Sequence, residues 1–191
     1  MIIKINETNF KETLQILEDI IKNGGLAIVP TDTVYGIICD GKNLTSKQNI
    51  FNLKGRTVNK TLIGFVENLQ SAEKFAYLPE NFLDFIKNKW PGKNTFVLKS
   101  KVNLTYLSTT QNTIGLRIPD FQLINKLNKK IEIIASTSAN ISGEKSASCL
   151  DEISKKIKEG VDICIDAGKI YGKASSVWDL TGEKPIILRK G

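Results

Sequence analysis

Segments with helical and extended apolar spacing alternate along this chain. Residues 9–23 place apolar side chains from Phe10 to Ile21 along one face of a predicted helix, and Gly24-Gly25 ends it. Elsewhere, short runs of consecutive apolar residues between turn-forming residues are typical of buried strands. Because the extended runs outnumber the helical ones, the pattern predicts an α/β fold with a twisted mixed sheet and flanking helices, and not a purely parallel sheet.

The expected elements follow from these runs and from the turn residues between them. Strands are predicted at residues 26–30, 37–39, 62–66, 95–98, 114–118, 131–135, 161–165, 175–179 and 186–189. Helices are predicted at residues 9–23, 46–54, 121–129 and 151–159, with a further pair within 71–89 that Pro79 divides. Ser46 and Asp151 are the expected N-caps of two of them. With no repeat or linker in 191 residues, we expect one domain over residues 1–191.

The composition is that of a soluble globular protein, at 41% hydrophobic and 25% charged residues. No apolar run approaches the ~18–20 residues that span a bilayer, and the N-terminal residues lack a signal-peptide layout. Cys39, Cys149 and Cys164 lie in or beside apolar segments without paired spacing, so they are expected to be reduced core residues. We therefore expect a cytoplasmic protein with no membrane partner.

The chain contains no histidine. This absence excludes Ser-His-Asp and Cys-His catalysis and any zinc site that needs imidazole. Chemistry must then depend on Lys, Arg, Asp, Glu, Tyr, Ser or Thr.

Only three of the 27 basic residues are arginine, namely Arg56, Arg117 and Arg189. In so lysine-rich a chain, arginine is expected where the planar fork that binds phosphate or carboxylate is needed, although three arginines could also remain by chance. The net charge of +7 fits anionic partners such as nucleotides or nucleic acid, but a scattered lysine surface gives the same sum.

Hydroxyl, carboxylate and phenol groups are concentrated between Pro30 and Gly36, at the end of an apolar run. A simple reversal of the chain would need only Gly, Asn or Asp. Two threonines, an aspartate and a tyrosine therefore suggest ligand contacts. An ordinary polar connection between two strands is the other interpretation, and neither Asp32 nor Tyr35 receives a defined role.

Three further segments could bind an anion, in a chain with no Gly-x-Gly-x-x-Gly motif and no Walker-A motif. Lys54-Gly55-Arg56 with Lys60 could converge on a polyanion, or be a solvated basic loop. The hydroxyl-rich loop expected at residues 136–143 could form an anion-binding nest, or bond internally. Arg117 and Arg189 at strand ends could bind a ligand, or form structural salt bridges.

Seven motifs occur in the order seen in YrdC/TsaC-type threonylcarbamoyl-AMP synthases, and the chain resembles that family from about residue 20 to residue 191. The motifs are Pro30-Thr31-Asp32-Thr33-Val34-Tyr35-Gly36, Lys54-Gly55-Arg56, Trp90-Pro91-Gly92, Arg117-Ile118-Pro119, Ser136-Thr137-Ser138-Ala139-Asn140-Ile141-Ser142-Gly143, Ser175-Ser176-Val177-Trp178-Asp179 and Leu188-Arg189-Lys190-Gly191. The resemblance implies a mixed α/β fold around a large basic cavity. It also implies the conversion of L-threonine, bicarbonate or CO2, and ATP to threonylcarbamoyl-AMP and pyrophosphate, for N6-threonylcarbamoyladenosine at position 37 of tRNA.

The resemblance also implies roles for individual residues. L-threonine would be held by Thr33, Arg117, Ser136 and Ser175. ATP would be held by Arg56, Lys60, Thr113, Ser138, Asn140, Ser146 and Arg189. Lys54 and Arg56 would be the catalytic residues at the carboxylation and phosphate site. Mg²⁺ is expected to arrive with ATP and to keep several waters, because no protein metal cage is apparent in the sequence.

The expected partners are ATP, L-threonine, bicarbonate and a downstream transferase complex, and a weak contact with tRNA is left open. One alternative is an RNA-binding module without adenylate-forming activity, for which steep salt dependence would be expected. Aromatic residues are only 7% of the chain and mostly lie in apolar stripes, which argues against a stacking platform. Another alternative is a carbamoyl-adenylate domain that uses a different amine or carbamoyl phosphate.

Overall fold

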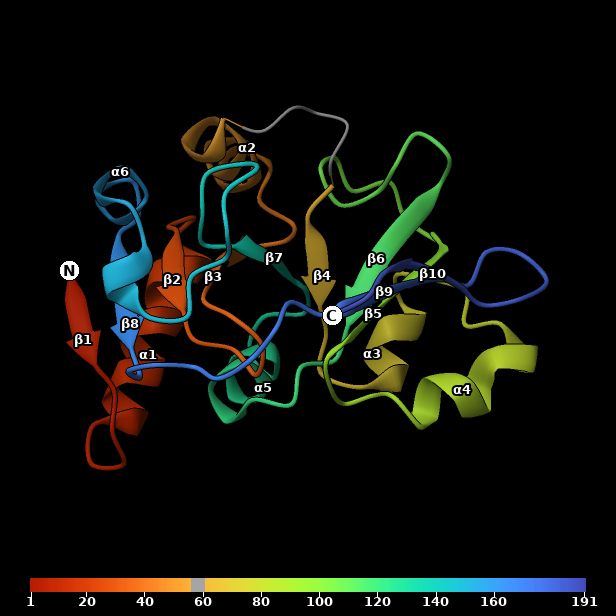
Figure 1. Cartoon of the computed structure of the whole chain (residues 1–191), viewed down its shortest axis with the longest axis horizontal. Helices are drawn as coiled ribbons and strands as arrows, with labels where there is room; N and C mark the ends of the chain where they lie inside the picture. Colours follow the sequence, from red (N-terminus) through yellow and green to blue (C-terminus); the bar gives the residue numbers. More distant parts are fainter. Residues whose placement is uncertain (56–60) are drawn as a thin grey trace.

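One mixed sheet of ten strands runs through the computed structural model, which describes residues 1–55 and 61–191 (Figure 1). The strands are β1 (Ile2–Lys4), β2 (Ala27–Val29), β3 (Gly36–Asp40), β4 (Ile63–Phe65), β5 (Asn94–Lys99), β6 (Thr113–Arg117), β7 (Ile134–Ser138), β8 (Ile163–Asp166), β9 (Ser176–Asp179) and β10 (Ile186–Arg189). Their order is β1-β8-β2-β3-β7-β4-β6-β5-β9-β10. Strand β8 pairs in parallel with β1 and β2, β4 with β6 and β5 with β9, while the other neighbours are antiparallel. The predicted mixed sheet is confirmed.

Helices cover both faces of this sheet. They are α1 (Phe10–Lys22), α2 (Leu44–Lys54), α3 (Leu69–Glu73), η1 (Glu80–Phe82), α4 (Leu83–Lys87), α5 (Gln122–Asn128), η2 (Leu150–Glu152) and α6 (Lys155–Glu159). Figure 1 shows α1 and α5 below the N-terminal half of the sheet, with α2 and α6 above it. No helix among the described residues is long and apolar enough to cross a bilayer.

Two apolar clusters form the core, one on each face of the sheet. In β2, Ala27 and Val29 join the cluster that contains Leu17 and Ile21 of α1. Their neighbour Ile28 joins the cluster on the opposite face. Successive side chains of a strand point to opposite faces, so a strand covered on both faces is apolar without alternation.

Both predicted helix caps are wrong by three residues. The N-cap of α2 is Asn43, whose side-chain oxygen accepts a hydrogen bond from the backbone N–H of Ser46. The hydroxyl of Ser46 instead donates to the carbonyl of Gly24 at 2.6 Å. Asp151 lies in η2, and Ser154 caps α6. In both places a nearby Asx or Ser residue competes for the cap, and pattern alone does not separate such candidates.

Strand β7 is also displaced from its prediction, because it begins at Ile134 and continues through Ser138. The hydroxyl residues expected in a loop are therefore strand residues, paired with β3 on one side and, at Ser136, with β4 on the other. Since their backbone groups serve the sheet, Ser136 and Thr137 do not form the predicted anion-binding nest. Strand β1, which was not predicted, pairs with β8 at the sheet edge.

Candidate active site

A cavity of about 480 Å³ lies against one face of the sheet, over the strands β3-β7-β4-β6-β5-β9-β10 in their order in the sheet. Alternation builds its wall. In β6, Ile114 and Leu116 face the core, while Thr113 and Arg117 face the cavity. In β5, Thr95 and Val97 face the cavity, while Phe96 and Leu98 face the core. The polar side chains in these strands are therefore the ones that alternation turns away from the core.

The structure brings ten of the twelve predicted site residues together on this one cavity. They are Thr33, Lys54, Thr113, Arg117, Ser136, Ser138, Asn140, Ser146, Ser175 and Arg189. The other two, Arg56 and Lys60, lie outside the described residues. Which ligand each residue contacts stays a prediction.

The connection between β2 and β3 carries an ordered chain of hydrogen bonds. The Thr31 hydroxyl donates to the carbonyl of Val34 at 2.7 Å and lies 2.9 Å from the Thr33 hydroxyl. Because the single proton of Thr31 is used on Val34, the proton between the two threonines must come from Thr33. Thr33 also accepts from Nη1 of Arg117 at 3.1 Å. One lone pair of Thr33 therefore remains, so Thr33 can offer a ligand only an acceptor.

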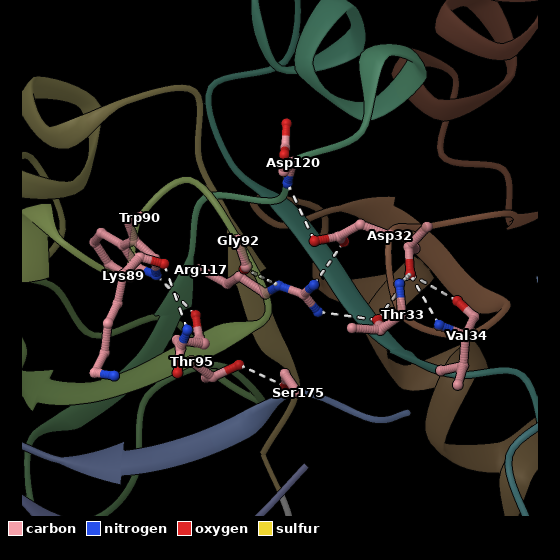
Figure 2. A network of polar contacts seen from close by, with 12 residues as sticks. Asp32, Thr33, Val34, Lys89, Trp90, Gly92, Thr95, Arg117, Asp120 and Ser175 are labelled. Atoms are coloured by element: carbon pink, nitrogen blue, oxygen red, sulfur yellow. Dashed lines mark hydrogen bonds and ion pairs between the residues drawn. The ribbon is translucent and has the colours of Figure 1, made fainter. Parts of the chain in front are cut away.

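The Arg117 guanidinium, 3% exposed, is held on three sides, as Figure 2 shows. Its Nε donates to the carbonyl of Gly92 at 3.0 Å and its Nη1 to Thr33. Its Nη2 forms an ion pair with Oδ1 of Asp32 at 2.5 Å. The structural salt bridge left open for Arg117 in the sequence is therefore present, and Asp32 has a defined contact. Because Arg117 also lines the cavity, the salt bridge and a ligand contact are compatible.

Burial lowers the pKa of Arg117, and the neighbouring Asp32 carboxylate opposes that shift. Arginine starts from so high a pKa that the side chain stays charged. A buried charge is tolerated when it is paired and hydrogen-bonded. Asp32 supplies the pairing, and its other oxygen accepts from the backbone N–H of Asp120 at 3.3 Å.

Ser175 and Arg189 form a second group at the cavity wall. The Ser175 hydroxyl lies 3.0 Å from that of Thr95, and both residues are buried. Arg189 donates from Nη2 and Nε to the Ser175 carbonyl, at 2.8 and 3.1 Å, and from Nη2 to the hydroxyl at 3.2 Å. Arg189, expected at the ATP, therefore contacts a residue expected at the threonine.

A β-bulge directs Arg189 to this position. Ile187 pairs with Trp178 of β9, but the next pair is Arg189 with Val177, so Leu188 is the extra residue. In a regular strand Arg189 would point to the same face as Ile187. The bulge reverses that alternation, and Arg189 joins Val177 on the cavity lining.

Lys54 ends α2 and is almost fully buried, at 2% exposed. Its Nζ donates to the carbonyls of Ser138 and Asn140, the latter at 2.5 Å. The Asn140 amide nitrogen donates in turn to the carbonyls of Ile141 and Glu144, at 2.9 and 2.7 Å. These bonds fix the chain after β7, so the predicted catalytic lysine has a structural contact with the segment predicted to hold ATP.

Tyr35 anchors the other end of the connection between β2 and β3. Its hydroxyl donates to the carbonyl of Gly168 at 2.8 Å and accepts from the N–H of Ala167 at 3.0 Å. Burial is the main cause that raises its pKa to about 12, so Tyr35 stays neutral and belongs to the core. Gly172 belongs to the segment that follows Gly168. It lies against the Thr33 backbone, where a Cβ would stand 2.2 Å from the Thr33 carbonyl oxygen.

Sequence reasoning gave no site role to Thr95 and Thr109 on the cavity wall, and it marked Thr31 only as a suggested ligand contact without a defined role. Thr31 orders the proton of Thr33, Thr95 contacts Ser175, and Thr109 lies 2.7 Å from Thr113 through their hydroxyls. A threonine inside an otherwise apolar strand was the available signal for Thr95. Thr109 lies in a segment without helix or strand, where no pattern marked it.

The cavity can hold an anion and orient it. Arg117 and Arg189 provide fixed N–H donors, Thr33 provides an acceptor, and Ser136, Ser138 and Ser146 add hydroxyls along the wall. Glu144 supplies a carboxylate to the described lining. Such a wall suits a ligand that combines a carboxylate, a hydrogen-bond donor and phosphates.

Comparison with known proteins gives consistent results. The model of the Sua5, YciO and YrdC family, described as telomere recombination, matches residues 19–191. A protein of Methanocaldococcus jannaschii, to which the name threonylcarbamoyl-AMP synthase is assigned provisionally, is 36% identical over 191 residues, which cover all of this chain and 91% of that protein.

The threonylcarbamoyl-AMP synthase of Pyrococcus abyssi is 32% identical over 195 residues, covering all of this chain but only 57% of that protein. The structure of P. abyssi Sua5 complexed with L-threonine matches 99% of this chain and 57% of that chain, with a TM-score of 0.89 and 30% identity. Escherichia coli YciO matches in fold, with a TM-score of 0.88 and 24% identity over all of this chain and 93% of that one.

Proposed function

The chain belongs to the Sua5, YciO and YrdC family, and from that premise we propose that it is a threonylcarbamoyl-AMP synthase. The reaction would consume L-threonine, bicarbonate and ATP, and release threonylcarbamoyl-AMP, pyrophosphate and water. The adenylate would serve the N6-threonylcarbamoyl modification of adenosine 37 in tRNA. The observation that carries the proposal is the convergence of ten predicted site residues on one cavity. The names of the M. jannaschii and P. abyssi relatives support it.

The amino-acid end of the cavity is proposed to be the wall formed by Thr33, Arg117 and Ser175. Arg117 offers N–H groups to a carboxylate, in an orientation that Gly92 and Asp32 hold fixed. Thr33 accepts one hydrogen bond from the amino acid, because its own proton is directed to Thr31. The complex of P. abyssi Sua5 with L-threonine supports this choice of ligand.

The nucleotide is proposed to lie along Thr113, Ser138, Asn140 and Ser146, together with Arg56 and Lys60 as the sequence predicts. Lys54 would hold this wall in place through the carbonyls of Ser138 and Asn140. Placing both anions in one enclosed site converts a reaction between separate molecules into an effectively intramolecular one.

The chemistry requires little proton transfer. Bicarbonate takes a proton from the threonine ammonium group and gives CO2 and water. The free amine then adds to CO2 and releases one further proton to solvent, which gives an N-carboxylate. An oxygen of this group then attacks the α-phosphorus of ATP, and the bond to pyrophosphate breaks. The work of the protein is orientation and stabilisation of charge on the phosphoryl oxygens, so the lack of histidine is no obstacle.

Mg²⁺ bound to ATP would neutralise phosphate charge during this step. Among the described residues no group of three acidic, cysteine or histidine side chains could hold a metal ion. The described lining nevertheless includes the Glu144 carboxylate, which fits an ion that arrives on phosphate oxygens and keeps most of its waters. Glu144 is the residue we propose to contact it.

The proposal is tested by incubating the protein with ATP, labelled bicarbonate and L-threonine, and by measuring pyrophosphate release and the mass of the adenylate. We expect product with threonine and much less with L-valine, which lacks the hydroxyl. Tight, salt-sensitive RNA binding without pyrophosphate release would contradict the proposal and favour the RNA-binding alternative.

A further inference from the structure

The Asp32–Arg117 ion pair makes its part of the cavity wall electrically neutral. The two side chains are 8% and 3% exposed, and 2.5 Å separates Oδ1 of Asp32 from Nη2 of Arg117 (Figure 2). Water is largely excluded from both, so little screening reduces the field of either charge. A ligand at Thr33 and Arg117 therefore meets a positive group with a negative group directly behind it.

Arg117 does not need this particular partner in order to be oriented. The Gly92 carbonyl and the Thr33 hydroxyl already fix two edges of the guanidinium. A neutral amide at position 32 could accept from Nη2 in the same geometry. A carboxylate adds negative charge and a second acceptor oxygen, which here takes the backbone N–H of Asp120.

Arg189, the second arginine on the described part of the wall, is not balanced in this way. Arg189 donates only to the carbonyl and hydroxyl of Ser175 in the part of the chain that the structure describes. The pKa of its guanidinium is lowered by partial burial of the group, and no carboxylate among the described residues raises it. Summed over Asp32, Arg117 and Arg189 alone, the charge at position 32 thus decides whether these three described residues carry one net positive charge or two.

We propose that Asp32 is a positioning residue for charge, which makes this end of the cavity select a zwitterionic α-amino acid over carboxylates that lack an amino group. Asp32 repels a bare carboxylate that approaches Arg117, which weakens its binding. A zwitterion loses less binding affinity, because its ammonium group is attracted by the same carboxylate. Metabolic carboxylates would thereby be kept from the site without any steric barrier.

The magnitude follows from charge alone. A unit charge several ångströms from a ligand, at the effective dielectric of a partly buried site, changes affinity by at least about tenfold. The threonine-to-carboxylate affinity ratio should therefore narrow by at least about tenfold when Asp32 becomes neutral. The choice of amino acid rests on the proposed function, but the charge argument applies to any α-amino acid.

The test is calorimetric titration of the wild type and of Asp32→Asn, without ATP, with L-threonine and with (R)-3-hydroxybutyrate. The second ligand is threonine without its amino group. We expect Asp32→Asn to bind 3-hydroxybutyrate more tightly than the wild type does. The ratio of the affinity for L-threonine to that for 3-hydroxybutyrate should therefore be at least about tenfold smaller in Asp32→Asn. Asp32→Glu, which keeps the charge, is the matched control and should retain the wild-type preference.

A purely structural role for Asp32 predicts something different, namely a parallel loss of affinity for both ligands with an unchanged ratio, and that result would overturn the proposal. If Asp32→Asn is unstable, melting temperatures serve as the readout. The buried cation left in the variant should make 3-hydroxybutyrate raise its melting temperature more than that of the wild type. The proposal would also be overturned if 3-hydroxybutyrate shifted the melting temperature of Asp32→Asn, or of the second variant Asp32→Ser, no more than that of the wild type. Absence of pyrophosphate release by the wild type refutes the proposed function alone, since the binding ratio is measured without ATP.

Discussion

Replacement of Thr33 by valine removes one oxygen and leaves the shape of the side chain almost unchanged. Thr33 is 3% exposed and accepts from Nη1 of Arg117 at 3.1 Å. Valine would leave that N–H without its acceptor and would remove the lone pair available to the substrate. Leaving a buried donor unsatisfied costs about 1–3 kcal/mol. We therefore expect the KM for threonine to rise by roughly 5- to 150-fold.

The assay is pyrophosphate release at varied threonine with saturating ATP, and then at varied ATP with saturating threonine. The KM for ATP should stay within about twofold, because its proposed contacts lie on other residues. Thr33→Ser is the matched control, since it keeps the hydroxyl and loses only a methyl group. It should stay close to the wild type in threonine KM.

One result would refute the reasoning directly. If Thr33→Val has wild-type threonine kinetics, Thr33 does not contact the substrate and the ordered hydrogen bonds from Arg117 to Val34 serve only the loop. A joint rise in both KM values, together with a lower melting temperature, would also count against the assignment. That pattern would indicate general disruption of the cavity.

Three further predictions concern residues around the site. Gly172→Ala should raise the KM for threonine more than the KM for ATP, because its Cβ would stand 2.2 Å from the Thr33 carbonyl oxygen. Gly182→Ala is the control and should leave both KM values unchanged, because no atom lies within 4 Å of the added Cβ. Equal kinetics of the two variants would contradict this packing argument. Lys54→Met should lower kcat/KM for ATP by about tenfold or more through release of the Ser138 and Asn140 carbonyls, and a wild-type value would show that those bonds are dispensable. Tyr35→Phe should lower the free energy of unfolding by about 1 kcal/mol at pH 8. The folded-state pKa of Tyr35 is raised to about 12, so its stabilising contribution is complete below its unfolded pKa of about 10 and falls as the pH rises towards 12. Urea unfolding at pH 8 and pH 11 should therefore show a smaller difference between the two proteins at pH 11.

The strands of the fold were predictable because most of them are buried on both faces. Continuous apolar runs such as that of β2 identify such strands without any alternation. Strand β7 was displaced because hydropathy treats Ser136 and Ser138 as loop residues, while the backbone continues its ladder and turns these hydroxyls to the cavity. Strand β1 was missed because three residues at an edge, partly exposed, carry too little pattern.

The site was predictable as a set of residues, mainly from motif order, but its internal contacts were not. The sequence does not show that Asp32 pairs with Arg117, since the partners are 85 residues apart and meet only through the sheet. The place of Arg189 depends on the bulge at Leu188, and a single extra residue leaves no signature in an apolar run. Thr95 and Ser175 likewise meet only because β5 and β9 are neighbours.

Strand β10, which carries Arg189, has consequences for local stability. It is the last strand of the sheet, it pairs with β9 alone, and all four of its residues are exposed. An edge strand with few buried contacts detaches at a small fraction of the free energy of global unfolding. Amide hydrogens of residues 186–189 should therefore exchange with solvent much faster than those of β7, and ligand binding to Arg189 should slow them selectively. The cavity wall that carries Arg189 is therefore expected to unfold locally at a lower free energy than the rest of the sheet.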